Sequence, residues 1–188
     1  MPNGTSRRHL PRVVVTGALV ALLLAIGAAP ATAEGEGVDP FPLPEQPDAL
    51  VSKNNRTYAG DGVYNTTGAG QTMSRNAARG TTVRFYLRTQ NDGDETIDVS
   101  FRGCAGNSSF KVTYFGVTPI LIDYTPQVVA GFTGFVYPGP VGPDWVVEVK
   151  VKRTAPAGAT LNCKFKLSTT DESLTTRRDT VQMTVRRS

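Results

Sequence analysis

Histidine is almost absent from this chain, because the one histidine among 188 residues is His9, close to the amino terminus. We expect that terminal segment to be removed on export, for reasons given below, so the mature protein would contain no imidazole. This absence excludes Ser–His and Cys–His nucleophiles, histidine metal sites and histidine acid–base catalysis. A phosphate loop is also missing, since the glycine-rich stretch Gly68–Thr72 has no lysine and precedes a strand.

Cysteine is nearly as scarce, with only Cys104 and Cys163. An even pair in an exported protein predicts a disulfide, with two buried thiols as the alternative. Neither cysteine belongs to a CxxC motif or has a histidine base, so a catalytic thiol is not expected. Closing a loop of this length would stabilise the fold by about 4 kcal/mol on the chain-entropy model.

A large excess of one charge is missing as well. The formal net charge is +4, but three of the 20 basic residues lie in the expected leader, which leaves 17 basic against 16 acidic residues. A mature protein this close to neutrality is not expected to bind nucleic acid.

The amino terminus has the pattern of a signal peptide over residues 1–33. Arg7, Arg8 and Arg12 precede an apolar run, and small residues follow at 31–33, which predicts cleavage after Ala33. The alternative is a membrane anchor, since the run approaches the length of a span. Residues 6–10 resemble a twin-arginine export motif, but Pro11 departs from it, so both the twin-arginine and the general secretory route stay open. We therefore expect a secreted, extracellular protein with no membrane span after cleavage.

Residues 34–48 contain five acidic residues, four prolines and no basic residue. This composition predicts a disordered acidic linker that tethers the folded domain, residues 49–188.

From residue 49 onward the apolar residues alternate with a period of two, and Gly, Pro, Asn and Asp clusters separate the runs. The pattern predicts an all-β fold, an antiparallel β-sandwich of about seven to nine strands without a helix. Residues 82–103 contain two alternating runs around an Asn-Asp-Gly turn, which we interpret as a hairpin. The expected strands are 62–64, 71–77, 82–89, 96–102, 109–115, 128–137, 145–153, 161–169 and 179–186, with 145–153 and 161–169 expected to pair.

The segment FYLRTQNDGDETIDV (85–99) resembles the strand, Asn-x-Gly-Asp turn and strand of bacterial extracellular immunoglobulin-like modules. These include the cell-adhesion-related domain and a domain appended to some secreted glycosidases. GAGQT, SFKVTYF and DTVQMTV are similar to stretches of the same modules. The resemblance implies an immunoglobulin-like sandwich that acts as a spacer, an adhesion unit or a carbohydrate-binding accessory, and it implies no catalytic residue.

A calcium site is one candidate. Asn91, Asp92, Asp94 and Glu95 offer hard oxygen ligands at loop spacing, although no complete EF-hand motif is present. The alternative is that these residues only form an Asx turn. The same acidic group would be the starting point for a small glycoside hydrolase, but carboxylates in a solvated turn lack the raised pKa that this chemistry needs.

Basic residues on three predicted strands form the second candidate, a face that would bind a polyanion such as teichoic acid. The alternative is a solvated sheet face on which lysines prevent aggregation. A third candidate is a sugar-stacking platform built from Trp145, Tyr58, Tyr64 and Tyr137, with Trp145 in the core as the alternative. The residues of the basic face are Arg84, Tyr86, Arg88, Lys150, Lys152, Lys164 and Lys166.

These observations favour a secreted non-enzymatic module that binds at the cell envelope or acts as a spacer. A carbohydrate- or calcium-binding accessory domain is the alternative, and a small hydrolase is the third reading. The expected partners are a cell-wall polyanion, a glycan or another protein, and an unpaired sheet edge would allow self-association.

Overall fold

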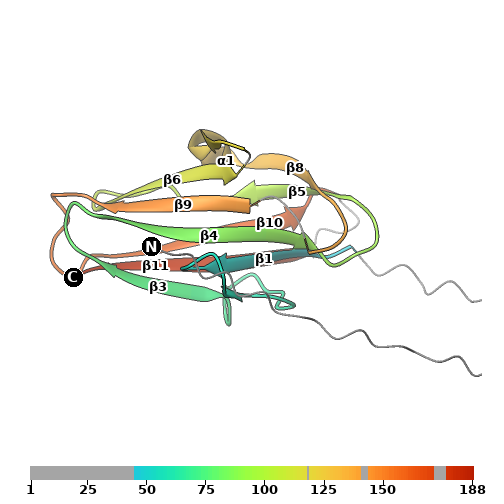
Figure 1. The fold of residues 1–188 in the computed structure, drawn as a ribbon, viewed down its shortest axis with the longest axis horizontal. Coiled ribbons are helices and arrows are strands. Elements are labelled where there is room, and N and C mark those ends of the chain that lie inside the picture. Colours follow the sequence, from blue (N-terminus) through green and yellow to red (C-terminus); the bar gives the residue numbers. More distant parts are fainter. Residues whose placement is uncertain (1–44, 118, 141–143, 172–176) are drawn as a thin grey trace, which may run out of the picture. The chain divides into compact units, whose positions relative to one another are not determined.

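The computed structural model describes residues 45–117, 119–140, 144–171 and 177–188, and there the chain forms two stacked β-sheets (Figure 1). The predicted signal peptide and the first part of the predicted linker lie outside the described residues. The first sheet has the order β2 (Tyr58–Ala59), β1 (Pro47–Ser52), β4 (Thr82–Asn91), β9 (Asp144–Val151), β6 (Phe110–Val117), β7 (Leu121–Asp123). The second has the order β3 (Thr72–Ala77), β11 (Arg178–Arg187), β10 (Thr160–Thr169), β5 (Ile97–Arg102), β8 (Phe132–Val136).

The predicted all-β sandwich is confirmed, with differences in detail. Eleven strands are present in the described part of the chain, against the seven to nine expected, and β3 pairs with β11 in parallel. The strand expected over 128–137 is instead a short helix, α1 (Thr125–Ala130), followed by β8. Pro126 lies in the first turn of α1, where its missing N–H costs nothing, and Gly131 ends the helix.

The hairpin predicted over 82–103 is wrong. β4 pairs with β1 and β9 in the six-stranded sheet, whereas β5 pairs with β10 and β8 in the five-stranded sheet, so the connection crosses from one layer to the other (Figure 1). Alternation shows that each strand has one apolar face, but it does not distinguish two paired strands from two strands that face each other. Here Phe85 and Phe101 both point into the layer between the sheets and are fully buried.

The core consists of the inward rows of both sheets. From the six-stranded sheet it includes Trp145, Val147 and Val149, and from the five-stranded sheet Cys163 and Phe165, all at most 4% exposed. Burying a side chain of this size stabilises the fold by about 1.5–3 kcal/mol. Trp145 lies within 5.8 to 6.4 Å, between ring centroids, of four neighbouring aromatic rings, which belong to Phe101, Tyr124, Phe132 and Phe165.

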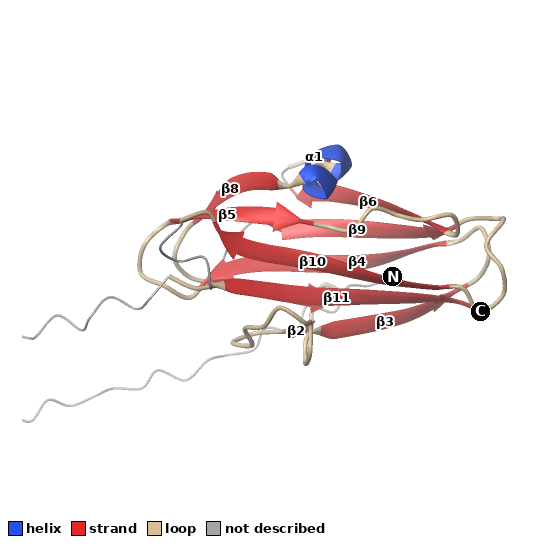
Figure 2. Ribbon diagram, turned by 180° about the vertical axis from the view of Figure 1, so that it is seen from behind, coloured by secondary structure: helices blue, strands red, loops and turns tan. Residues whose placement is uncertain are grey.

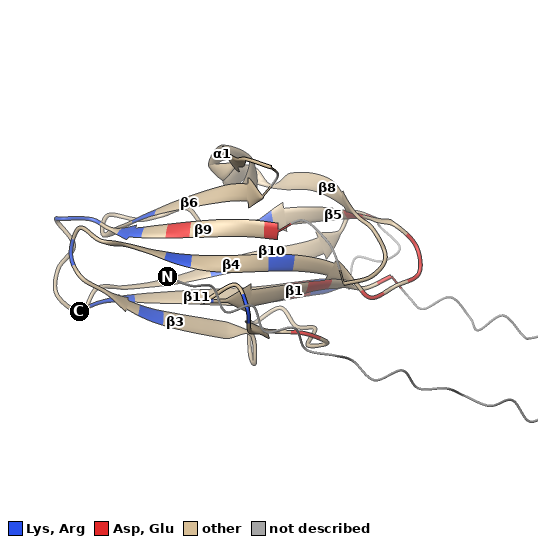
Figure 3. Ribbon diagram, in the orientation of Figure 1, with Lys and Arg blue, Asp and Glu red and all other residues tan. Residues whose placement is uncertain are grey.

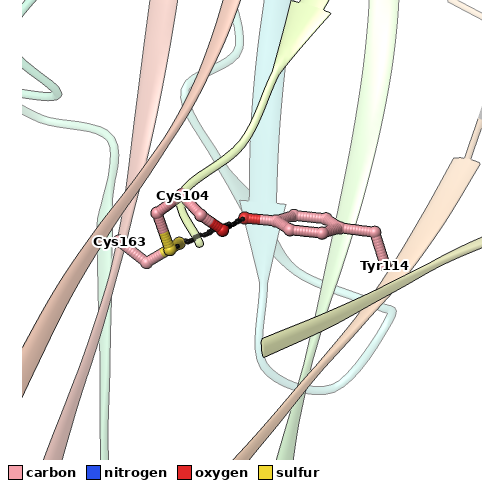
Figure 4. The surroundings of a disulfide bond; sticks show 3 residues. All are labelled: Cys104, Tyr114 and Cys163. Atoms are coloured by element: carbon pink, nitrogen blue, oxygen red, sulfur yellow. Dashed lines mark hydrogen bonds between the residues drawn. A yellow bond between two sulfur atoms is a disulfide. The ribbon is translucent and has the colours of Figure 1, made fainter. Parts of the chain in front are cut away.

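Cys104 and Cys163 form a disulfide within the second layer, and Tyr114 reaches it from the first (Figure 4). The Tyr114 hydroxyl donates to the Cys104 carbonyl oxygen at 3.1 Å and lies 3.2 Å from the Cys163 Sγ. A Cβ on Gly103 would stand 2.4 Å from the tyrosine ring, so only glycine fits there. The disulfide therefore joins β10 to the segment after β5 within one sheet, and the Tyr114 hydrogen bond ties the other sheet to it at the same place.

Removing this bridge should lower the stability substantially. The variant Cys104→Ser/Cys163→Ser is expected to lose about 4 kcal/mol, because the unfolded chain regains the entropy of an open loop. Calorimetry should show a melting temperature lower by roughly 10 °C or more. A reductant should reproduce this fall in the wild type and have no effect on the variant; equal melting temperatures would contradict the prediction.

Candidate functional site

The predicted basic face is divided between the two outer surfaces of the sandwich. The expected pairing of 145–153 with 161–169 is wrong, because β9 lies in the six-stranded sheet and β10 in the five-stranded sheet. Lys150 and Lys152 therefore lie on the opposite side of the molecule from Lys164 and Lys166. Two strands that are adjacent in sequence can lie in the same sheet or in facing sheets, and their side-chain alternation is identical in both cases.

Most of the cations predicted on the six-stranded sheet already have partners. Arg84 lies 2.7 Å from Glu148, and Arg88 lies 3.1 Å from Asp144 and covers the Tyr58 ring at 4.6 Å. Tyr86 lies between these two arginines on β4 and is half-buried. In addition, Lys152 donates to the Asn107 carbonyl oxygen at 2.6 Å. This face is thus a network of paired charges, each worth little at a solvated surface.

The five-stranded sheet faces the viewer in Figure 2, and its outer surface carries another set of cations. Lys166 of β10 stands directly opposite Arg102 of β5, and Lys164 follows on the same side of β10. Arg178 of β11 stands opposite Ser168. We call these four residues, Arg102, Lys164, Lys166 and Arg178, the basic groove. Arg102 and Arg178 were missed in the sequence, since only the strand pairing places them beside the two lysines.

Two shallow hollows follow the basic groove. One, of about 270 Å³, is lined by Arg102, Lys166 and Arg178 together with hydroxyl side chains. The other, of about 350 Å³, is lined by Arg102, Lys164 and Lys166 with Asn162. No acidic residue is among the described residues that line either hollow, although Asp98 projects from the same face of β5 further along. The hydroxyl groups belong to Thr66, Ser100, Ser168 and Thr180.

Two cations directly opposite each other on neighbouring strands repel, at a cost of about 0.2–1 kcal/mol. An anion bound between Arg102 and Lys166 would remove that repulsion and would accept hydrogen bonds from both cations and from the neighbouring hydroxyls. The arrangement is therefore suited to bind phosphate, sulfate or carboxylate groups, and it offers no nucleophile with an adjacent base.

The predicted calcium turn is built around Asn91, which is fully buried. Its Oδ1 accepts from the Gly93 N–H at 3.0 Å, and its Nδ2 donates to the Glu95 and Val136 carbonyl oxygens. The structure thus shows the Asx turn that the sequence analysis gave as the alternative. Asp92 accepts a hydrogen bond from the Tyr64 hydroxyl, while Asp94 and Glu95 are exposed.

Within the described ranges, no three His, Cys, Asp or Glu side chains are grouped so that they could hold a metal ion. Calcium binding by Asn91, Asp92, Asp94 and Glu95 stays a prediction. Thermal unfolding with and without millimolar calcium would check it.

The proposed sugar platform does not assemble. Trp145 is 4% exposed and belongs to the core. Tyr58 lies beneath Arg88, and Tyr64 is engaged with Asp92. Tyr137 is 66% exposed and follows β8 in the other sheet. The four aromatic side chains therefore do not form one stacking surface.

A pair of buried carboxyl groups, Asp48 and Asp179, was not predicted from the sequence. Asp48 of β1 and Asp179 of β11 are both fully buried and share a hydrogen bond. Asp48 also accepts from the Gly62 N–H at 2.9 Å. Asp179 accepts from four donors at 2.7 to 3.1 Å, namely the backbone N–H groups of Ala49, Asn65 and Thr180 and the Gln71 Nε2. The pair thereby joins the first strand, the last strand and the loop between β2 and β3.

The pKa of Asp48 is raised from 3.8 to about 8, mainly by burial; the hydrogen bond from Gly62 opposes this shift, and the nearby charges of Asp179 and Asp92 contribute to it. Two adjacent buried carboxylates cannot both be ionised at low cost. Asp48 is accordingly the protonated member and donates to Asp179, which also accepts hydrogen bonds from the four donors named above. The prediction that Pro47 and Asp48 belong to the disordered linker is wrong, because β1 begins at Pro47.

The pair predicts an unusual dependence of stability on pH. Between about pH 4 and about pH 8 the folded protein holds a proton on Asp48 that the unfolded chain has released. The free energy of unfolding should therefore fall as the pH rises through this window, by up to about 1.4 kcal/mol per pH unit. In Asp48→Asn the amide replaces the donated proton, so urea unfolding should show a nearly flat dependence and a more stable protein near the top of the window.

The reciprocal variant is the control. In Asp179→Asn an NH2 group replaces one of two oxygens that both accept from N–H donors, so at least one buried donor loses its acceptor. This variant should be destabilised by about 2–3 kcal/mol across the same window. If Asp48→Asn and Asp179→Asn behaved alike, the assignment of the proton to Asp48 would be wrong.

Comparisons with known proteins identify no family. No protein-family model matches the chain, and no curated protein sequence matches it. Solved structures that resemble it include the N-terminal domain of PorA, with a TM-score of 0.42, 10% identity and coverage of 74% of this chain and 96% of that domain. In the described residues, no helix is long and apolar enough to cross a membrane.

Two further solved structures resemble the chain weakly. A family 123 glycoside hydrolase from Clostridium perfringens has a TM-score of 0.42 and 10% identity, and the match covers 75% of this chain but only 27% of the enzyme. The collagen-binding subdomain of the Enterococcus faecalis surface protein ACE has a TM-score of 0.28 and 14% identity, covering 61% of this chain and 92% of the subdomain. We infer no ligand or activity from likenesses this weak.

Proposed function

We propose that the protein is a secreted, non-enzymatic β-sandwich module of the immunoglobulin-like kind that binds an anionic polymer of the cell envelope. The observation that carries the proposal is the basic groove, in which cations from β5, β10 and β11 gather around two hollows lined by hydroxyl and amide groups. The signal-peptide pattern of residues 1–33 supports an extracellular location.

The geometry favours a polymer over a small ion. The two hollows share Arg102 and Lys166, so together they form one continuous track across neighbouring strands. Adjacent strands are about 4.8 Å apart, and alternate residues along one strand are about 7 Å apart. A chain with repeated anionic groups can contact several of these cations at once, and the simultaneous contacts raise the affinity beyond that of a single group.

The absence of a mature histidine and the surroundings of the acidic residues support a non-enzymatic role. Asp48, whose pKa is raised, and its neighbour Asp179 are fully buried and hold strands together. A glycoside hydrolase needs its two carboxyl groups on either side of a bound sugar. The binding proposal therefore rests on the cations and not on the acids.

The proposal is tested by binding to long-chain inorganic polyphosphate and by co-sedimentation with cell envelopes isolated from the source organism. Arg102→Gln/Lys166→Gln should bind polyphosphate about tenfold more weakly, because two charge-assisted contacts are lost. Its affinity should also depend less on salt, since fewer counterions are displaced. Sulfated dextran and polygalacturonate, assayed alongside, distinguish phosphate, sulfate and carboxylate polymers.

Lys111→Gln/Lys150→Gln is a matched control. Lys111 and Lys150 also stand directly opposite each other and are exposed, but on the six-stranded sheet and away from the basic groove. This variant should bind like the wild type. Equal weakening in both double variants would show non-specific attraction, and no sedimentation of the wild type with envelopes would overturn the proposed function.

A further inference from the structure

The charges of the sandwich are also unevenly distributed along its long axis. At the end where β4 runs into β5, the connection carries Asp92, Asp94 and Glu95, and Asp61 of a neighbouring loop lies close by (Figure 3). An open hollow of about 550 Å³ is lined by Asp61, Asp92 and Asp94. We call this region the acidic end. Arg177 also lies at the acidic end, where its guanidinium donates to the Glu45 carbonyl oxygen.

The acidic end also contains a buried polar group without a partner. Gln90 is 7% exposed and lines the same hollow, and its Oε1 accepts no hydrogen bond from the described residues. Its Nε2 donates weakly to the Pro140 carbonyl oxygen at 3.4 Å. A buried carbonyl oxygen without a donor destabilises the fold by about 1–3 kcal/mol.

The opposite end of the molecule is basic. The connection from β3 to β4 carries Arg79, the connection from β9 to β10 carries Lys152 and Arg153, and β11 ends at Arg186 and Arg187. These segments lie side by side, since the Gly80 N–H donates to the Val151 carbonyl oxygen and the Arg187 N–H to that of Ala159. Residues 78–81, 152–159 and 186–188 contain no acidic residue. We call this region the basic end.

The two ends are separated by the length of β4. Pro47 lies beside Asn91 at the acidic end, whereas Ala77 precedes the start of β4 and accepts from Ser188 at the basic end. Ten residues of strand span roughly 30 Å. At an ionic strength of about 10 mM the Debye length is also about 30 Å. The opposite charges at the two ends therefore form a dipole that can attract a neighbouring molecule.

We propose that copies of this chain associate head to tail, with the basic end of one copy seated in the acidic hollow of the next. In this contact Arg79 and Arg153 of one copy meet Asp61, Asp92 and Asp94 of the other. The planar guanidinium of each arginine can pair with a carboxylate through two parallel hydrogen bonds. Because the two surfaces differ, the contact is heterologous, and repetition gives a linear array and not a closed dimer.

A second copy of the chain is the molecule expected in the acidic hollow, since each copy presents both complementary surfaces. This inference does not rest on the polyanion proposal, because the basic groove lies on the outer face of the five-stranded sheet. Loss of one interaction would leave the other in place.

The test is sedimentation velocity of the exported protein over a range of concentrations. At about 10 mM salt the weight-average mass should rise with protein concentration. Half of the molecules should be associated at about 100 µM, as for weak transient contacts. At about 1 M salt the protein should be monomeric, because screening removes the attraction. A wild type that stays monomeric in low salt at millimolar concentration would overturn the proposal.

Charge reversal at each end gives a sharper test. Arg79→Glu/Arg153→Glu places two carboxylates at the basic end, and Asp61→Lys/Asp94→Lys places two cations at the acidic end. Each variant has like charges in place of the proposed ion pairs, so each variant alone should be monomeric. An equimolar mixture should associate again, because each variant supplies the surface that the other lacks. A mixture that remains monomeric, or either variant that still self-associates, would refute the head-to-tail contact.

Lys53→Glu/Arg56→Glu is the matched control. These exposed cations lie in the turn between β1 and β2, and β1 ends opposite Tyr86 in the middle of β4, so the same charge change is made away from both ends. This variant should associate like the wild type. Loss of association here would show that net charge, and not the two ends, determines the behaviour.

Discussion

The structure depends on burial of the apolar layer between the two sheets. Each strand presents one apolar and one polar side. In this nearly all-β chain the apolar side is removed from water by a second sheet placed against it. This constraint explains why β4 and β5 separate into different layers, since pairing them edge to edge would leave Phe85 and Phe101 in the same sheet. The disulfide adds a covalent link within the five-stranded layer, and Tyr114 adds a hydrogen bond between the two layers.

The sequence predicts the existence of most strands because alternation is a local property. β3, β4, β5, β6, β9, β10 and β11 all begin and end within two residues of the expected strands. It does not predict the partners of those strands, since one pattern of alternation is compatible with several topologies. This cause explains both the wrong hairpin over 82–103 and the wrong pairing of β9 with β10. As a consequence, the residues predicted to form one basic face lie on two opposite surfaces.

Asp48 shows a second limit. Its neighbours in sequence are prolines and acids, which locally indicate a solvated linker. Its position is determined by Asp179, 131 residues later, and by Gly62, which lie beside it only after both sheets have formed. α1 and β7 escaped prediction for a related reason: elements of a few residues have too little periodicity to identify, and tertiary contacts decide their conformation.

The single tryptophan gives the molecule an internal spectroscopic reporter. Trp145 is the only indole in the chain and is enclosed by aromatic rings from β5, β8 and β10 and from the segment before α1. Its emission therefore reports on the polarity of the layer between the sheets and on nothing else. Separation of the two layers would expose the indole to water and shift its emission to longer wavelength, whereas changes confined to the outer faces would leave the spectrum as it is. Loss of the internal packing can thus be distinguished from rearrangement at the surface without attaching a label.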